Sequence, residues 1–116
     1  VVGDQVGCPA WTAHMARAIV SLVDIGAAGT VHAPGGGQCS WRQFACAILE
    51  QAGIDAPVEE VSSPPPGDPA SAPRPAYSVL DDSRLRRWGV EPLPHWKDAL
   101  RGYFVERSKR SHAHRD

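Results

Sequence analysis

The sequence predicts an α/β fold, because segments with helical periodicity alternate along the 116 residues with short β-prone runs. Three such runs, at 29–33, 58–61 and 77–80, are too few and too weak to form a stable sheet alone. We therefore expect their sheet partners to come from polypeptide outside this chain. The chain begins with Val1-Val2 and no methionine, which resembles a strand already under way and predicts a piece of a longer protein.

The first helix is predicted from Thr12 to Val23, with Thr12 as its N-cap and Gly26 just past its end. Its apolar residues recur at the spacing of one buried helical face: Met15, Ala16, Ile19, Leu22 and Val23.

The clearest helix follows Ser40, because Ser40 and Gln43 match the S-x-x-Q capping box and Gly53 can end the helix. An apolar stripe lies along it: Trp41, Phe44, Ala45, Ile48, Leu49 and Ala52. Of the four tryptophans, Trp41, Trp88 and Trp96 are expected in the core, whereas Trp11 lies in a proline-bounded loop.

Six of the eleven prolines lie between Pro64 and Pro75. Proline lacks a backbone donor, so this stretch favours a long ordered surface loop over a strand or helix, with a flexible linker as the alternative. A short helix is expected from Asp81-Asp82 to Gly89, and a last one from Trp96 to Val105. We therefore divide the chain into a folded part, 1–106, and a polar tail without regular structure, 107–116.

Composition excludes several classes of protein. Twelve Lys and Arg against thirteen Asp and Glu give a net charge of −1, which does not indicate a nucleic-acid partner. No stretch reaches the roughly 18–20 apolar residues of a membrane span, and none resembles a signal peptide. The three cysteines contain no C-x-x-C pair, which predicts reduced thiols in a cytoplasmic protein.

Two motifs imitate functional sites. The loop 34–40 contains Gly35-Gly36-Gly37 between a β-prone run and a helix, but Ser40 stands where a dinucleotide fingerprint needs its third glycine. These glycines therefore favour a sharp turn. His112 and His114 form an H-x-H pair without further ligands, and His14, His32 and His95 have no partner at a catalytic spacing.

Arg74 is the most informative charged residue. It lies between Pro73 and Pro75, where the fixed φ angles stiffen the backbone that presents its guanidinium. Such an arginine suits bidentate recognition of a phosphate or carboxylate, although an exposed loop arginine without a ligand is the alternative.

Five segments, in order, resemble the C-terminal part of the dTDP-4-dehydrorhamnose reductase family of extended short-chain dehydrogenase/reductases. They are 4–12 (DQVGCPAWT), 29–32 (GTVH), 40–45 (SWRQFA), 73–81 (PRPAYSVLD) and 93–100 (LPHWKDAL). The resemblance covers about residues 1 to 105. It implies the C-terminal substrate-binding lobe of an NAD(P)-binding Rossmann-fold reductase, without most of the Rossmann domain.

Members of this family reduce dTDP-4-dehydro-6-deoxy-L-mannose to dTDP-L-rhamnose with NADPH. The resemblance implies that a missing N-terminal domain holds the cofactor, because this chain lacks the glycine fingerprint and the Tyr-x-x-x-Lys pair. Tyr77 is followed four residues later by Asp81, and Tyr103 by Arg107. We therefore expect no catalytic and no cofactor-binding residue here, and an inactive isolated chain.

What the resemblance does imply is half of a pocket for a dTDP-sugar. Gln5, Gly7 and Pro9 match the D-Q-x-G-x-P turn beside the sugar-nucleotide cleft, and Trp11 lies in the same loop. Arg74 matches the R-P segment whose arginine contacts the nucleotide diphosphate in related reductases and epimerases.

Two departures from the family pattern weaken this transfer. Ala10 replaces the usual threonine, and Ala13-His14 replace an acidic residue early in the helix, so we expect no metal. Whether the parent protein is a homodimer stays open. The alternatives are a fragment of a sugar-nucleotide epimerase, or a non-catalytic subunit of the same fold like the regulatory partner of methionine adenosyltransferase.

Overall fold

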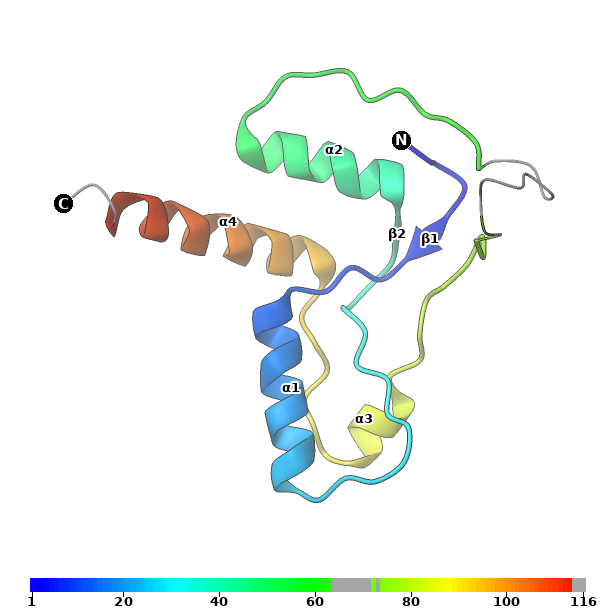
Figure 1. Ribbon diagram of the computed structural model, residues 1–116, viewed down its shortest axis with the longest axis vertical. Coiled ribbons are helices and arrows are strands. Elements are labelled where there is room, and N and C mark those ends of the chain that lie inside the picture. The colour runs from blue at the N-terminus through cyan, green and yellow to red at the C-terminus, as the bar shows by residue number, and fades with distance from the viewer. Residues whose placement is uncertain (64–71, 73, 114–116) are drawn as a thin grey trace.

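A computed structural model describes residues 1–63, 72 and 74–113. Two groups of elements make up the chain (Figure 1). One half contains the strands β1 (Val6–Gly7) and β2 (Cys39–Ser40) with the helices α2 (Trp41–Ala52) and α4 (Trp96–Ala113). The other half contains α1 (Thr12–Asp24) and α3 (Ser83–Arg87).

β1 pairs on both of its edges. It is antiparallel to β2, with Val6 opposite Ser40, and Val6 also forms an isolated parallel bridge with Tyr77. The predicted strands at 58–61 and 77–80 are therefore reduced to single bridges, the former through Val61. The predicted strand at 29–33 has no β-pairing with any described residue. These three predictions were wrong in extent, because a strand needs neighbours that this chain does not supply.

Each half has its own small core. In the half with α1 and α3, the core consists of Ala18, Leu85, Val90 and Leu93, and Leu85 has no exposed surface. In the other half, Cys39, Trp96 and Leu100 are buried against Phe44, Ala47, Ile48 and Phe104. The burial predicted for Trp96 is thereby confirmed, whereas Trp41 and Trp88 are 54% and 40% exposed, so their predicted core positions were wrong.

Local helix signals were predicted well where they depend on neighbouring residues. Ser40 Oγ accepts a hydrogen bond from the Gln43 backbone N–H (3.1 Å), and Gln43 Oε1 accepts one from the Ser40 N–H (2.8 Å), which confirms the capping box of α2. Gly53 ends α2 with φ +66°. Asp82 is the N-cap residue of α3, which ends before Gly89 at φ +72°.

α1 begins differently from the prediction. Trp11, not Thr12, is its N-cap residue, and no side chain caps the helix. Thr12 is already helical, because the extended backbone of Trp11 turns into the helix one residue earlier. Gly26 has φ +67°, as expected for the residue past the helix end.

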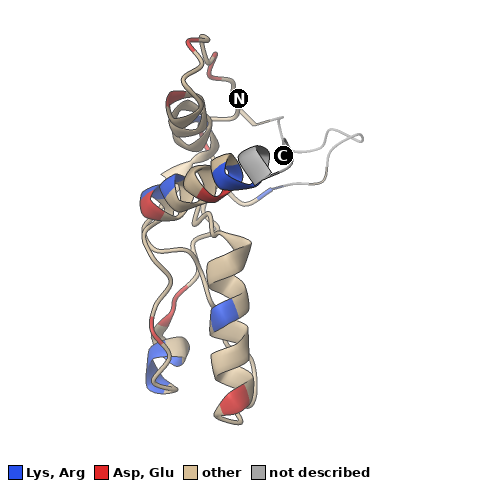
Figure 2. Ribbon diagram, turned by 90° about the vertical axis from the view of Figure 1, so that its left-hand side faces the viewer, with Lys and Arg blue, Asp and Glu red and all other residues tan. Residues whose placement is uncertain are grey.

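α4 extends to Ala113, so the prediction of an irregular tail from residue 107 was wrong. Ion pairs one turn apart support the helix, between Arg101 and Asp98 and between Arg110 and Glu106. Figure 2 shows charged residues of both signs along α4. In α1 the Lys, Arg, Asp and Glu residues are Arg17 in the middle and Asp24 at the C-terminal end. Residues 114–116 and most of the predicted proline-rich loop, 64–71 and 73, lie outside the described residues.

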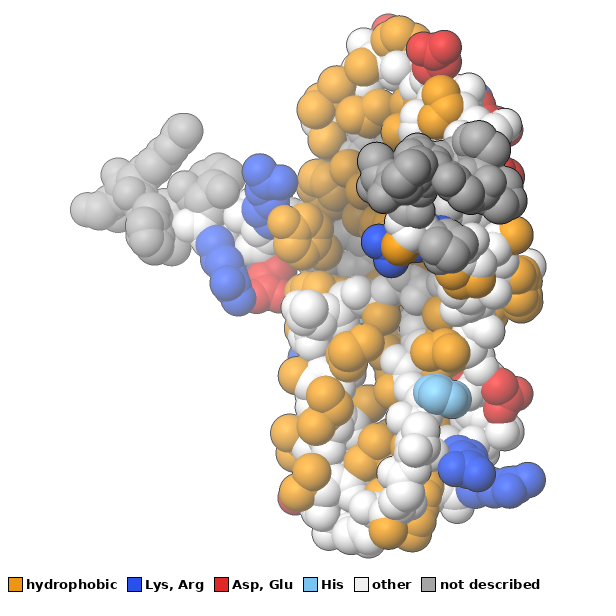
Figure 3. Space-filling view, turned by 45° about the vertical axis from the view of Figure 1, so that its right-hand side comes forward, with side chains coloured by type: hydrophobic (Ala, Val, Ile, Leu, Met, Phe, Trp, Pro, Cys, Tyr) orange, Lys and Arg blue, Asp and Glu red, His pale blue; other side chains and the backbone are white. Residues whose placement is uncertain are grey.

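The chain is open and flat, with extents of 49 × 44 × 23 Å. Its Cα radius of gyration is 17.1 Å, whereas a compact domain of this length has about 13 Å. Its exposed area is 8387 Å², against about 6,100 Å² for a compact monomer of this mass. Hydrophobic side chains accordingly show at the surface in both halves (Figure 3). Among the described helices, none is long and apolar enough to cross a membrane.

Candidate functional site

The predicted substrate-binding turn runs from Gln5 through β1 to Trp11, and it connects the two halves of the chain (Figure 1). Gly7 lies within β1 opposite Cys39, and a Cβ at Gly7 would lie 3.4 Å from Ser78 Oγ. The turn is thus fixed by backbone pairing at its centre.

Asp4 and Gln5, which precede β1, form hydrogen bonds with Ser63. The Asp4 carboxylate accepts hydrogen bonds from the Ser63 backbone N–H (2.9 Å to Oδ2) and from Ser63 Oγ (2.7 Å to Oδ1). Gln5 Nε2 donates to Ser63 Oγ at 2.8 Å. The side-chain and backbone hydrogen bonds from Ser63 lower the pKa of Asp4. Ser63 is therefore tied to the residues that precede β1.

Ala76 and Ser78 are hydrogen-bonded to β1 itself. The Val6 N–H donates to the Ala76 carbonyl (2.8 Å), and the Ser78 N–H donates to the Val6 carbonyl (2.9 Å). Tyr77 is 62% exposed. Its Oη donates a hydrogen bond to Gln38 Oε1 at 2.9 Å. Residues far apart in sequence are thus brought to a single short strand.

Arg74 lies two residues before this second attachment and is exposed. Its guanidinium has no hydrogen bond or ion pair with another residue that the structure describes. Arg74 is thus an exposed residue two positions before Ala76, which is hydrogen-bonded to Val6.

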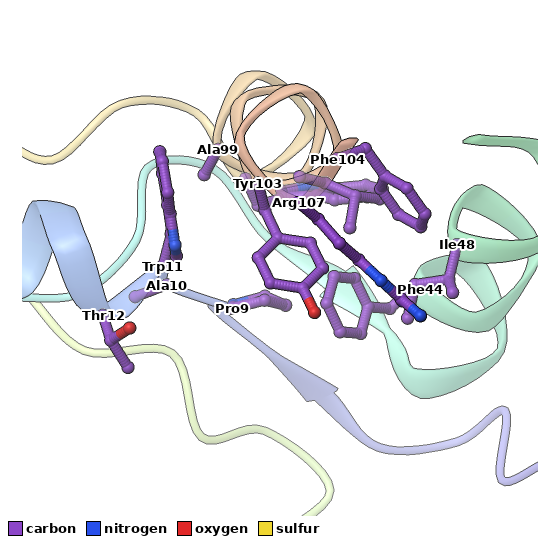
Figure 4. Close-up of a pocket in the computed structure, with 12 residues that line it drawn as sticks. Pro9, Ala10, Trp11, Thr12, Phe44, Ile48, Ala99, Tyr103, Phe104 and Arg107 are labelled. Carbon is purple, nitrogen blue, oxygen red and sulfur yellow. The ribbon is translucent and has the colours of Figure 1, made fainter. Parts of the chain in front are cut away.

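The apolar part of the site is a cavity of about 420 Å³ between the start of α1 and the helices α2 and α4. Pro9 and Trp11 line it, whereas Gln5, Gly7 and Arg74 do not. Figure 4 shows Tyr103 between Trp11 on one side and Phe44 on the other. The remaining lining residues are Ala10, Thr12, Ile48, Trp96, Ala99, Leu100, Phe104 and Arg107.

The predicted site thus has two parts, a polar edge with Gln5 and Arg74 and an apolar cavity with Pro9 and Trp11. Sequence analysis missed Asp4 and Ser63, which organise the polar edge, because 59 residues separate them and no local motif links them. It also missed Tyr103 and Arg107 as cavity residues, although their four-residue spacing places them on one face of a helix.

The space beside the glycine loop that precedes β2 is occupied by other residues of the chain. A Cβ on Gly35 would lie 1.8 Å from the Pro9 carbonyl oxygen, and one on Gly37 would lie 2.4 Å from His95 Nε2. The Gly36 N–H donates to the Pro94 carbonyl at 3.0 Å. These glycines allow close packing and hold no open cradle for a phosphate. This glycine loop therefore does not fit the phosphates of a dinucleotide.

Thiol and metal chemistry find little support in the part of the chain that the structure describes. Burial raises the pKa of the Cys39 thiol, which disfavours its reactive thiolate. Cys8 and Cys46 are also free. No group of three or more His, Cys, Asp or Glu side chains lies close enough to hold a metal ion among these residues.

The helices α1, α2 and α4 and the turn that leads into α1 have the arrangement of the substrate-binding part of a Rossmann-fold reductase. Solved structures of such reductases match this chain. A dTDP-4-dehydrorhamnose reductase from Bacillus anthracis, in complex with NADP, matches with a TM-score of 0.83 at 35% identity, over 91% of this chain and 37% of that one. The enzyme from Clostridium acetobutylicum also matches with a TM-score of 0.83 at 35% identity, over 93% of this chain and 38% of that one.

The chain belongs to the RmlD substrate binding domain family, whose model matches residues 1–108. The spore coat polysaccharide biosynthesis protein SpsK of Bacillus subtilis is 40% identical over 108 residues, 93% of this chain and 37% of that protein. The dTDP-4-dehydrorhamnose reductase of Streptomyces griseus is 40% identical over 110 residues, 90% and 36% of the two chains. The predicted family and fold class are thus confirmed, and the chain spans little more than a third of these relatives.

Proposed function

We propose that this chain is the substrate-binding part of a dTDP-4-dehydrorhamnose reductase. It binds dTDP-4-dehydro-6-deoxy-L-mannose, which becomes dTDP-L-rhamnose with NADPH as the reductant. Relatives named for this activity support the proposal, and another, from Streptomyces niveus, is named for reducing dTDP-4-keto-6-deoxy-D-glucose. The shared substrate class is a dTDP-linked 4-keto sugar.

The observation that carries the proposal is that the exposed Arg74 lies two residues before Ala76, whose carbonyl accepts a hydrogen bond from Val6 in the predicted substrate-binding turn. Ser63 is held by Asp4 and Gln5, and Ala76 is held by Val6. The hydrogen bond from Val6 to Ala76 holds the backbone two residues from Arg74 against β1, which favours presentation of the guanidinium on this side of the turn.

The roles of the residues follow from their chemistry. The Arg74 guanidinium donates charge-assisted hydrogen bonds to the diphosphate. Pro9 and Trp11 provide an apolar wall that excludes water from one side of the nucleotide sugar. Gln5 binds Ser63 through a hydrogen bond. The chain binds and orients substrate, and none of its residues is assigned to hydride or proton transfer.

Saturation-transfer NMR on the 116-residue chain tests this role with dTDP and thymidine as observed probes and pyrophosphate as a competitor of dTDP. We expect signals from dTDP and weaker or no signals from thymidine, because the diphosphate supplies the charged contacts. Arg74→Ala should weaken dTDP binding about 10- to 150-fold, which corresponds to one charged hydrogen bond of about 1.5–3 kcal/mol. Arg17→Ala, at an exposed arginine on α1, is the matched control.

Two results would contradict the proposal. One is the absence of any dTDP signal at millimolar concentration. The other is dTDP binding that Arg74→Ala and Arg17→Ala change equally, since any cation would then serve.

A further inference from the structure

Tyr77 makes a side-chain hydrogen bond that reaches across β1. Its backbone pairs with Val6 along one edge of β1, in an isolated parallel bridge. The opposite edge of β1 pairs with β2, which begins directly after Gln38. Because Tyr77 Oη donates to Gln38 Oε1 at 2.9 Å, the phenol side chain spans β1 from one edge to the other. It thereby joins three neighbouring backbone segments.

The Gln38 end of this bond lies on a firmly held backbone. Cys39, the next residue, is 4% exposed and belongs to the core that contains Trp96. Before Gln38, the Gly36 N–H donates to the Pro94 carbonyl (3.0 Å), and the Gly36 carbonyl accepts a hydrogen bond from the Trp96 N–H (2.8 Å). The acceptor of the phenol hydroxyl is therefore fixed on both sides by the start of α4 and its core.

The chain between Tyr77 and Arg74 has few free backbone torsions. The ring of Pro75 fixes its φ angle, and a residue that precedes a proline, here Arg74, is restricted to extended conformations. The Ala76 carbonyl accepts the hydrogen bond from the Val6 N–H at 2.8 Å. A change in the position of Tyr77 is therefore transmitted to Arg74 rather than absorbed by the residues between them.

The backbone hydrogen bonds that attach this segment converge on one residue of β1. The Val6 N–H donates to Ala76, and the Val6 carbonyl accepts from the Ser78 N–H. A segment joined at one residue can swing about it, whereas a second contact on the far side of β1 prevents that motion. Tyr77 is 62% exposed and Gln38 is also exposed, so their hydrogen bond contributes orientation rather than core packing.

We propose that Tyr77 and Gln38 are positioning residues for Arg74. Their hydrogen bond fixes the direction in which the segment 74–78 leaves β1, and it thereby holds the guanidinium where the diphosphate of a dTDP-sugar binds. This inference rests on the proposed function, and it adds a specific source of affinity, which is preorganisation by two side chains that do not touch the ligand.

A double-mutant cycle on the 116-residue chain tests the proposal, with the dissociation constant of dTDP measured by chemical-shift titration. Tyr77→Phe keeps the exposed ring and removes the hydroxyl, and Gln38→Leu removes the acceptor. Each should weaken dTDP binding by roughly 3- to 10-fold, the range for one lost neutral hydrogen bond. The double variant should bind like either single variant, because both substitutions remove the same bond. Gln51→Leu, at an exposed glutamine of α2, is the control and should leave the affinity unchanged.

Two further readouts separate positioning of Arg74 from other effects of these substitutions. The planar guanidinium must be oriented, whereas a lysine presents a point charge on a flexible stem that tolerates displacement. In an Arg74→Lys background, Tyr77→Phe should therefore change dTDP affinity by less than about twofold. Without ligand, the NMR order parameter of the Arg74 backbone N–H should fall by about 0.1 or more in Tyr77→Phe.

Four results would overturn the positioning role while the unmodified chain binds dTDP. Tyr77→Phe and Gln38→Leu leave the affinity unchanged, or their effects add in the double variant. Tyr77→Phe has the same effect in the Arg74→Lys background, which would indicate that the hydroxyl contacts the ligand itself. The order parameter of Arg74 does not change in Tyr77→Phe. Absence of dTDP binding by the unmodified chain would instead contradict the proposed function, and this inference would fall with it.

Discussion

The two halves of this chain differ in how many of their backbone groups are paired and how well their helices are capped within the chain. In the half with β1, β2, α2 and α4, short strands are paired, α2 is capped at both ends, and residues 59 positions apart are joined by hydrogen bonds. In the half with α1 and α3, α1 has no side-chain cap, and the segment 29–35 makes no backbone hydrogen bond with another described residue. The first half holds the polar edge of the candidate site, whereas the second leaves Ile19, Val20 and Val23 of α1 exposed.

The difference shows that some residues of this sequence form contacts within the chain, whereas others leave apolar side chains and backbone groups uncovered. The polar edge of the candidate site is assembled from hydrogen bonds within the chain. The exposed apolar side chains of α1 and the backbone of 29–35 take no part in it.

The core beside α1 should be the most sensitive point of the less complete half. Leu85→Ala removes its one fully buried side chain and should lower the free energy of unfolding by about 2–5 kcal/mol. Urea denaturation measures this loss. Leu80→Ala, at a leucine 47% exposed, is the control, and equal losses would show that the core is not organised around Leu85.

The close contact between the glycine loop and the turn should be next in size. Gly35→Ala places a Cβ 1.8 Å from the Pro9 carbonyl oxygen, so the backbone must move, at a cost of about 1–3 kcal/mol. Gly7→Ala, whose Cβ meets Ser78 Oγ at 3.4 Å, should cost less. If Gly35→Ala were tolerated without loss in thermal denaturation, the loop would have room for a ligand after all.

Helix capping provides a direct contrast between the halves. Ser40→Ala removes a capping-box hydrogen bond of α2 and should destabilise the chain by about 0.5–2 kcal/mol. Thr12→Ala, at the start of α1, should have little effect because no side chain caps that helix. Chemical denaturation of both variants checks this, and a larger loss for Thr12→Ala would reverse the contrast.

The smallest expected effect concerns acid. Hydrogen bonds from Ser63 lower the pKa of Asp4 in the folded chain below its ordinary 3.8. Their stabilisation is therefore fully present above that value and is lost as the pH falls through the lower folded-state pKa. Asp4→Asn should remove this part of the acid sensitivity, which sets in as the pH falls below 3.8. Unfolding curves with the same pH dependence in both proteins would exclude an effective Asp4–Ser63 contact.

The sequence predicted features whose chemistry is local. The capping box of Ser40 and Gln43 and the glycines that follow the helices depend on residues a few positions apart, and the structure contains them. The β-prone runs at 29–33, 58–61 and 77–80 are not extended strands here, which agrees with the expectation that they need neighbouring strands from outside this chain. The helix through Ala113 was missed because ion pairs, rather than an apolar stripe, support its last turns.

The candidate site was predicted through family resemblance more than through physics. Gln5, Pro9, Trp11 and Arg74 were named from their motifs, and the structure divides them between a polar edge and a cavity. What motifs could not show is the link between them, because Asp4, Ser63 and Val6 act through contacts between distant segments.

Amide exchange of the isolated chain tests the central contrast most directly. The N–H groups of Gly3, Val6 and Ser78, which donate to Val61, Ala76 and Val6, should exchange at least about tenfold more slowly than those of residues 30–33. That result would show that the polar edge of the candidate site is hydrogen-bonded within this chain, whereas the backbone of residues 30–33 is unpaired. Equal rates in the two sets, or slower exchange at residues 30–33, would contradict it.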